Sequence, residues 1–323
     1  MNGSIERILG LRHVCFSSSG THGLLFEGVV RALEDHIPEY DRWARELRGV
    51  TGTSGGAIAA LALALSVNRE VRNMLHSLGD FANVVRCPDV SLMMHAYGVD
   101  DGEYMKQLTR DLLTAGGLCA SSTMADLHRL LRLDVVFVAH SMTEGVSVHL
   151  SAQNTPDMLV SDAVFASCCI PFVFTPLRYK DLVLCDGVLS ECIPDVFPVE
   201  STLHVVIPPT ATRHLDVDSW CGFMFCLLRA CTMSQLPRID AILAMDNTIR
   251  VSHPFMNGIS TMNRFADGMI DAVIQCGYVV GMTYMYPISQ PACDLLTKYV
   301  RIMYDDAAES RAGEYESEDD PHD

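Results

Sequence analysis

The sequence predicts an α/β fold with a largely parallel central sheet, and two observations support this prediction. Short apolar or β-branched stretches alternate with helical ones as far as residue 207, which is typical of layered α/β folds. Two residues able to do chemistry, Ser54 and Asp186, each follow a predicted strand. Because ligands of such sheets bind at the carboxyl ends of the strands, we expect a functional site where these two residues fall.

The first predicted unit is a strand, a loop and a helix. The strand spans 13–16, the loop of mostly small residues spans 17–23, and the helix spans 24–35 with apolar side chains at helical spacing. A loop of this kind can turn successive backbone N–H groups toward an oxyanion. Taken alone, the same segment is an ordinary connection between a strand and a helix.

The next unit holds the most informative segment, which reads Val-Thr-Gly-Thr-Ser-Gly-Gly-Ala over 50–57. A strand is predicted at 48–51 and an almost purely Ala, Leu and Ile helix at 57–65. Gly-x-Ser-x-Gly between a strand and a helix is typical of a nucleophile elbow, a sharp turn that exposes the serine hydroxyl. The start of the helix favours negative charge beside it. The elbow comprises Ser54 with Gly52, Thr53, Gly55 and Gly56 around it.

The segment 68–133 is predicted to be helical and irregular, with an amphipathic helix at 101–113. Its apolar residues include Met74, Met93 and Met94. The simpler interpretation is that these helices face the core. In the other interpretation they form a lid over an acyl-chain pocket, where methionines supply adaptable apolar surface.

Strands and one helix are predicted along the following part of the chain. The strands are 134–139, its hairpin partner 145–150, then 177–180, 182–185 and 203–207, and the helix is 155–168. From 218 to 304 the chain is predicted to be mainly helical. One apolar face in that part is expected to pack against the sheet, and the other interpretation is an interfacial helix that contacts lipid. This face comprises Trp220, Phe223, Met224, Leu227 and Leu228.

Composition limits the classes of function. Of the 323 residues, 49% are hydrophobic and 20% are charged, as in globular proteins. The chain has no run of 18 apolar residues and its first residues lack the apolar run of a signal peptide, so we expect no transmembrane segment and an intracellular, cytoplasmic protein. The net charge of −17 disfavours nucleic acid as a partner.

The cysteines and the acidic end of the chain add two expectations. Twelve cysteines occur without a Cys-x-x-Cys pair, so we expect reduced, mostly buried thiols and no zinc site. Nine acidic residues stand against the single basic Arg311 over 305–323. Such a segment cannot bury enough apolar surface to order itself, and we expect an acidic disordered tail.

Taken together, these segments resemble the patatin-like phospholipases. The elbow around Ser54 matches the nucleophile motif of that family, and Asp186-Gly187-Val188 resembles its acid motif. The connecting segments 154–158 and 166–171 are also similar to the corresponding segments of the family, as is the first loop with Gly20 and Gly23. The resemblance extends over about residues 10–207.

The resemblance implies a patatin-like three-layer α/β/α fold and a phospholipase A-like acyl hydrolase that cleaves carboxylic ester bonds. Ser54 would attack the ester as the nucleophile, and Asp186 would be its general base, through an acyl-enzyme. Backbone N–H groups of Gly20 and Thr21 would form the oxyanion hole. The resemblance implies no cofactor and no metal. The expected partner is lipid at a membrane or lipid-droplet surface that the protein contacts peripherally, and the oligomeric state is left undetermined.

The resemblance and the composition together predict three parts of the chain. Residues 10–207 would form the patatin-like phospholipase domain. Residues 208–304 would be a C-terminal helical extension packed on the same core, and 305–323 would be the acidic tail.

Three residues depart from the pattern of the family. Ser18 replaces the first glycine of the oxyanion segment, His22 its basic residue, and Val188 the final Gly or Ala of the acid motif. These departures leave open a catalytically silent scaffold that binds lipid or a protein partner. His22 would act either through a positive charge that favours anionic lipids or as a neutral hydrogen-bonding residue.

A Ser-Asp-His esterase is the other alternative. Its residues occur in the chain order serine, acid, histidine. The histidines that follow Asp186 in the sequence are His204, His214 and His253.

Overall fold

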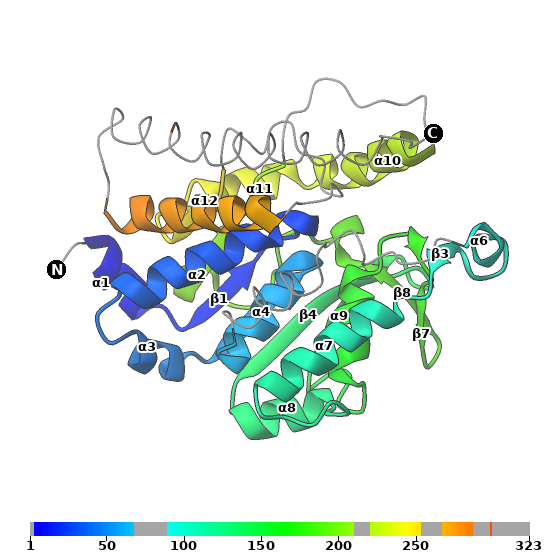
Figure 1. Cartoon of the computed structure of the whole chain (residues 1–323), viewed down its shortest axis with the longest axis horizontal. Helices are drawn as coiled ribbons and strands as arrows, with labels where there is room; N and C mark the ends of the chain where they lie inside the picture. Colours follow the sequence, from blue (N-terminus) through cyan, green and yellow to red (C-terminus); the bar gives the residue numbers. More distant parts are fainter. Residues whose placement is uncertain (1–2, 68–88, 210–219, 253–266, 287–297, 299–323) are drawn as a thin grey trace, which may run out of the picture.

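The computed structural model describes residues 3–67, 89–209, 220–252, 267–286 and residue 298. The predictions for 68–88, for His214 and His253 and for the acidic tail therefore lie outside the described residues. Within them, an eight-stranded sheet has the order β10-β9-β1-β2-β4-β8-β7, and β5 also pairs with β4 (Figure 1).

The strands of this sheet are β1 His13–Phe16, β2 Gly49–Thr53, β4 Asp134–Ser141, β5 Val146–Leu150, β7 Leu177–Tyr179, β8 Leu182–Asp186, β9 Thr202–Val206 and β10 Thr248–Arg250. A separate pair consists of β3 Gly98–Asp100 and β6 Phe172–Phe174. The α-helices are α1 Gly3–Gly10, α2 Leu24–His36, α3 Tyr40–Glu46, α4 Gly55–Leu65, α6 Val90–Ala96, α7 Glu103–Ala115, α8 Met124–Leu131, α9 Val160–Cys168, α10 Trp220–Ser234, α11 Leu236–Leu243 and α12 Asp267–Met285. Short 3₁₀ helices are η1 Gly20–Gly23, η3 Gly187–Leu189 and η4 Val199–Ser201.

The sheet is mostly parallel, as the sequence predicts, because β10, β9, β1, β2 and β4 all run in one direction. The strands β5 and β8 are antiparallel to β4, and β7 is antiparallel to β8. The hairpin of β4 with β5 is confirmed.

The long strand β4 brings two other strands end to end. Its residues 134–138 pair with β2, 139–141 pair with β8, and 137–141 pair with β5. A strand has two edges, and each edge of a given residue pairs with one neighbouring strand only. The range of β4 that pairs with β5 overlaps the range that pairs with β2 and the range that pairs with β8. Therefore β5 lies along one edge of β4, while β2 and β8 share the other edge and approach each other with their carboxyl ends.

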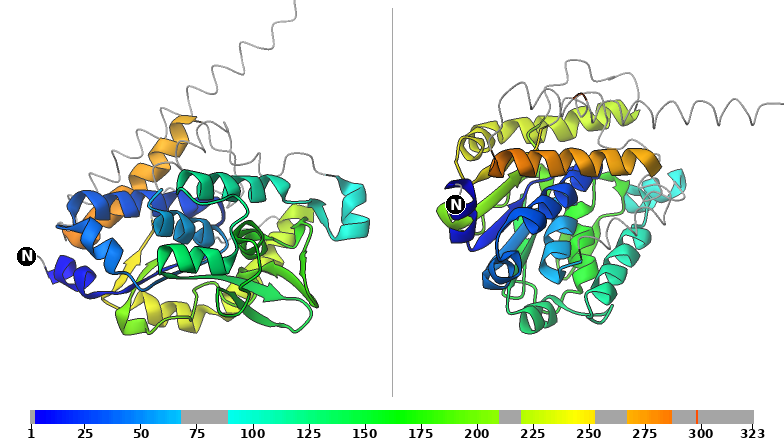
Figure 2. Two further views of the ribbon diagram at one scale, coloured as in Figure 1. Left: turned by 90° about the horizontal axis from the view of Figure 1, so that it is seen from below. Right: turned by 60° about the vertical axis from the view of Figure 1, so that its left-hand side comes forward.

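Helices cover both faces of the sheet, so the fold has the three layers that the sequence predicts. On β1, the side chains of Val14 and Phe16 belong to the main core. Cys15 between them belongs to a smaller core with Ile239 and Ile242 of α11. Because successive side chains of a strand point to opposite faces, the two cores lie on opposite sides of the sheet. The left view of Figure 2 shows the blue helix α2 on one side of the strands and the yellow helix α11 on the other.

The C-terminal helix α12 packs against α2, and glycines allow the close approach. A Cβ atom on Gly28 of α2 would stand 1.9 Å from the Ile274 carbonyl oxygen. One on Gly277 of α12 would stand 2.0 Å from the Leu25 carbonyl oxygen. This contact supports the proposal that 208–304 share the core of the preceding domain. Among the described residues, none of the helices combines the length and the hydrophobicity needed to span a bilayer.

Two expectations about helices are corrected. Helix α9 begins at Val160 and not at residue 155, because the carbonyl of Met158 accepts the N–H of Met124 and so lies outside the helix. The apolar face of α10 is not a packing face throughout, since Phe223 and Leu227 are 50% and 47% exposed.

Candidate active site

The backbone at Ser54 forms the sharp turn that the elbow motif predicts. Ser54 joins β2 to α4 with φ 57° and ψ −128°, a conformation that few residues other than glycine adopt. The flanking glycines leave room for this turn. A Cβ on Gly52 would stand 2.0 Å from the Gly56 carbonyl oxygen, and one on Gly56 would stand 2.3 Å from the Ser17 carbonyl oxygen. Side chains at these positions would displace the turn.

The structure brings Ser54 and Asp186 together, although they lie 132 residues apart in the sequence. The Ser54 hydroxyl donates to Asp186 Oδ2 over 2.7 Å. The other carboxylate oxygen, Oδ1, accepts the N–H of Val188 over 2.9 Å. Both side chains are buried, with Ser54 6% exposed and Asp186 fully buried. Val188 therefore contributes a backbone donor that does not depend on its side chain.

Burial also changes the acidity of Asp186. Loss of contact with water raises the pKa of its carboxyl group to about 7, while the hydrogen bonds from Val188 and Ser54 oppose the rise. A carboxylate with a pKa near neutrality is well suited to accept a proton and then return it.

Helix α9 supports the elbow with two residues for which the sequence predicted no role of their own. Ser167 Oγ accepts the N–H of Ser54 over 3.0 Å and donates to the Val138 carbonyl over 2.6 Å. The thiol of Cys168 donates to the Ser54 carbonyl over 3.1 Å. Both residues lie in the segment 166–171 that resembles the patatin-like family, which was the signal available in the sequence. Cys168 and its neighbour Cys169 are free thiols.

The predicted oxyanion residues lie against the elbow. Gly20 and Thr21 open η1, and the first N–H groups of a helix have no partner within it. The Gly20 carbonyl oxygen lies 2.5 Å, and the Gly20 nitrogen 3.4 Å, from the position that a Cβ of Gly55 would occupy. His22 in the same turn is buried, and Ser18 donates its N–H to the Cys192 carbonyl over 2.7 Å.

Among the described residues, the geometry places no histidine between the serine and the acid, and His214 and His253 lie outside those residues. Asp186 accepts directly from the Ser54 hydroxyl, which leaves no gap for a bridging imidazole. His204 lies in β9, which is separated from β2 by β1. Burial lowers the pKa of His204 to about 4.

Comparison with known proteins adds independent findings. A family model for patatin-like phospholipases matches residues 14–195. The chain is 25% identical over 176 residues to the triacylglycerol lipase ptl2 of Schizosaccharomyces pombe, a match that covers 52% of this chain and 26% of the lipase. It is 28% identical over 222 residues to the uncharacterized protein YqhO of Bacillus subtilis, which covers 62% of this chain and 72% of that protein. The chain thus spans about a quarter of the length of the yeast lipase.

A solved structure shares the fold. VipD from Legionella pneumophila superposes with a TM-score of 0.51 at 15% identity, over 85% of this chain and 67% of that one.

Proposed function

The chain belongs to the patatin-like phospholipase family, and from that premise we propose that it hydrolyses carboxylic ester bonds of acyl lipids with Ser54 as nucleophile and Asp186 as general base. The observation that carries the proposal is the direct hydrogen bond of 2.7 Å between Ser54 Oγ and Asp186 Oδ2 in a buried elbow. Its geometry matches what a serine nucleophile requires, a base within hydrogen-bonding distance of the hydroxyl.

The reaction follows in two steps. Ser54 Oγ attacks the ester carbonyl carbon while its proton passes to Asp186 Oδ2. The tetrahedral oxyanion is stabilised by N–H groups of Gly20 and Thr21 and by the start of α4. When the bond to the alcohol breaks, Asp186 returns the proton to the leaving oxygen and an acyl-enzyme remains. Asp186 then takes a proton from water, which attacks the acyl carbonyl, and the fatty acid leaves as Ser54 recovers its proton.

The proposed substrate is an acyl lipid presented by a membrane or lipid-droplet surface. Exposed apolar side chains near the small β3–β6 pair support contact with such a surface. Tyr97 directly precedes β3, Gly98 pairs with Phe172 of β6, and Met94 lies on α6 just before them. All three side chains, Met94, Tyr97 and Phe172, are exposed. The yeast relative is named for triacylglycerol, so both phospholipids and neutral lipids belong in the test.

The test is release of fatty acid from phosphatidylcholine vesicles, from lysophosphatidylcholine and from a triacylglycerol emulsion. The variants are wild type, Ser54→Ala and, as a matched control, Ser121→Ala at an exposed serine outside the site. We expect release by wild type and the control and none by Ser54→Ala. If the wild type binds the vesicles but releases no fatty acid from any of these lipids, the chain is a silent scaffold.

A further inference from the structure

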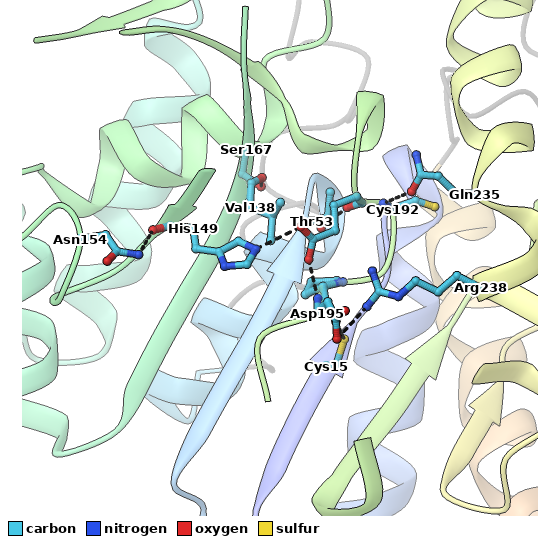
Figure 3. A network of polar contacts seen from close by, with 12 residues as sticks. Cys15, Thr53, Val138, His149, Asn154, Ser167, Cys192, Asp195, Gln235 and Arg238 are labelled. Atoms are coloured by element: carbon cyan, nitrogen blue, oxygen red, sulfur yellow. Dashed lines mark hydrogen bonds and ion pairs between the residues drawn. The ribbon is translucent and has the colours of Figure 1, made fainter. Parts of the chain in front are cut away.

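Glu191 is a buried acid beside the site that the proposed mechanism does not use. Its side chain is 5% exposed. Carboxylate atom Oε2 lies 3.0 Å from Nε2 of His149, and Oε1 accepts the N–H of Asp195. Figure 3 labels these two partners, His149 and Asp195. A buried carboxylate is costly unless it is paired and hydrogen-bonded, and here both oxygens have partners.

The backbone of Glu191 connects the two halves of the dyad. Its carbonyl accepts the hydroxyl of Thr53 over 2.9 Å, and Thr53 directly precedes Ser54. Its N–H donates to the carbonyl of Gly187 over 2.8 Å, and Gly187 directly follows Asp186. One residue therefore holds both the end of β2 and the start of the segment after β8.

The sheet places His149 where it can hold Glu191. Val138 of β4 pairs with Thr53 on one edge and with His149 of β5 on the other. Directly paired residues of neighbouring strands point to the same face, so Thr53, Val138 and His149 form one row and Glu191 contacts both ends of it. The His149 backbone is held in turn by Asn154, whose amide donates to the His149 carbonyl over 3.0 Å.

The charges around this pair favour its ionised form. The hydrogen bond with Glu191 raises the pKa of His149 against the effect of burial, with Asp195 acting in the same direction and Arg238 against it. Burial raises the pKa of Glu191, whereas the hydrogen bonds from His149 and from the Asp195 N–H lower it. Together the hydrogen bonds outweigh burial, and the pKa of Glu191 is lowered. Arg238 of α11 is itself engaged with Asp195, over 3.3 Å.

We propose that Glu191 and His149 are positioning residues, which hold Thr53 and Gly187 together and thereby keep Ser54 Oγ within hydrogen-bonding distance of Asp186. This inference rests on the proposed function. The pair acts through backbone geometry, because neither side chain contacts the reacting atoms. Loss of the contact between Glu191 and His149 reduces turnover without changing the acidity of Asp186.

The test compares five variants on a short-chain p-nitrophenyl ester, with kcat, KM and the pH profile measured for each. His149→Leu removes the donor, His149→Gln retains a donor near the place of Nε2, and Glu191→Gln removes the charge. The fourth variant combines His149→Leu with Glu191→Gln. Arg238→Gln is the control, since it breaks the neighbouring ion pair with Asp195 and leaves the contact between Glu191 and His149 intact.

We expect His149→Leu and Glu191→Gln each to lower kcat by about tenfold or more, because small displacements of reacting groups are costly. KM and the acid limb of the pH profile should stay unchanged. The double variant should lose no more than the worse single variant, since the two residues act as one unit. His149→Gln and the control should keep most of the wild-type kcat.

Two results would overturn the inference, namely wild-type kcat in folded Glu191→Gln, or losses that add in the double variant. If His149→Leu does not fold, the comparison of Glu191→Gln with His149→Gln decides. Failure of the proposed function has a different outcome, because wild type and Arg238→Gln would then be inactive as well.

Discussion

Thr53 and Asp186, the last residues of β2 and β8, pair with adjacent residues of β4, Val138 and Ala139. Because both strands lie along one edge of β4, their carboxyl ends meet. The residue that follows Thr53 is Ser54, and its hydroxyl therefore reaches the carboxylate of Asp186. The candidate dyad is thus a consequence of strand register, and four predictions follow from its geometry and from the helices packed around it.

Gly187→Ala should damage both stability and activity. A Cβ at Gly187 would stand 2.4 Å from the Val138 carbonyl oxygen and 2.9 Å from Cγ2 of Thr53, so the segment after Asp186 must move. We expect a loss of about 2 kcal/mol in the free energy of unfolding and a large fall in ester hydrolysis. Urea denaturation and kcat measure the two effects. Gly10→Ala is the control, because a Cβ there meets nothing within 4 Å. Equal stability of both variants would contradict the prediction.

Ser54→Gly should be more stable than Ser54→Ala. Both variants lack the nucleophile, but only glycine adopts φ 57° and ψ −128° without strain. After allowance for the greater chain entropy of unfolded glycine, the expected difference is about 1 kcal/mol. Chemical denaturation of the two inactive variants measures it. Greater stability of the alanine variant would show that the turn stores no strain at this residue.

Asp186 should make the protein less stable as the pH rises. Its pKa is raised by burial from 3.8 to about 7 in the folded chain. Between about pH 4 and pH 7 the folded state therefore holds a proton that the unfolded state has released, and the free energy of unfolding falls as the pH rises through this window. The rise in pKa by about three corresponds to a loss of at most roughly 4 kcal/mol in the free energy of unfolding across this window.

Asp186→Asn provides the measurement of that effect. The amide keeps the shape of the side chain and has no charge to bury. The variant should match the wild type below pH 4 and exceed its stability above pH 7, as measured by urea denaturation at several pH values. A difference that is constant across the pH range would refute the assignment of the raised pKa.

Gly28→Ala should destabilise the contact of α2 with α12. Within a helix, alanine is ordinarily more favourable than glycine by about 1 kcal/mol. At Gly28 the added Cβ would collide with the backbone of α12 at Ile274. We therefore expect the substitution to lower the free energy of unfolding instead of raising it. The measurement is the thermal unfolding of Gly28→Ala compared with that of the control variant Gly10→Ala. A stabilised Gly28→Ala variant would show that α12 does not pack as described.

The sequence contained enough signal for the main strands and for the two residues of the candidate dyad. Strands such as 13–16 and 203–207 are short apolar runs bounded by polar loops, and the elbow glycines mark a turn with a known steric purpose. The antiparallel direction of β8 could not be predicted, because the pattern of a strand carries no information about the direction of its neighbour. The strands β3, β6, β7 and β10 have only three residues each, too few for any periodicity, and only β7 among them was predicted from the sequence.

The supporting residues of the site were largely beyond sequence reasoning. Glu191 and His149 lie 42 residues apart and belong to no motif. Their only signal is a charged or polar residue within an otherwise apolar stretch, which also describes many surface residues. Their contact depends on the pairing of Val138 with both Thr53 and His149, and that register emerges only from the folded sheet.

Labelling by a fluorophosphonate tests the central claim, that Ser54 is a nucleophile activated by Asp186. The measurement is the rate of adduct formation against pH in wild type and in Asp186→Asn, with the modified residue located by mass spectrometry. We predict an adduct on Ser54 whose rate of formation rises with pH up to about pH 7, as Asp186 ionises. In Asp186→Asn the rate should fall by about a hundredfold or more, the usual effect of losing a general base. An adduct on another residue of an enzyme that hydrolyses lipid, or labelling of Asp186→Asn at the wild-type rate, would contradict the account.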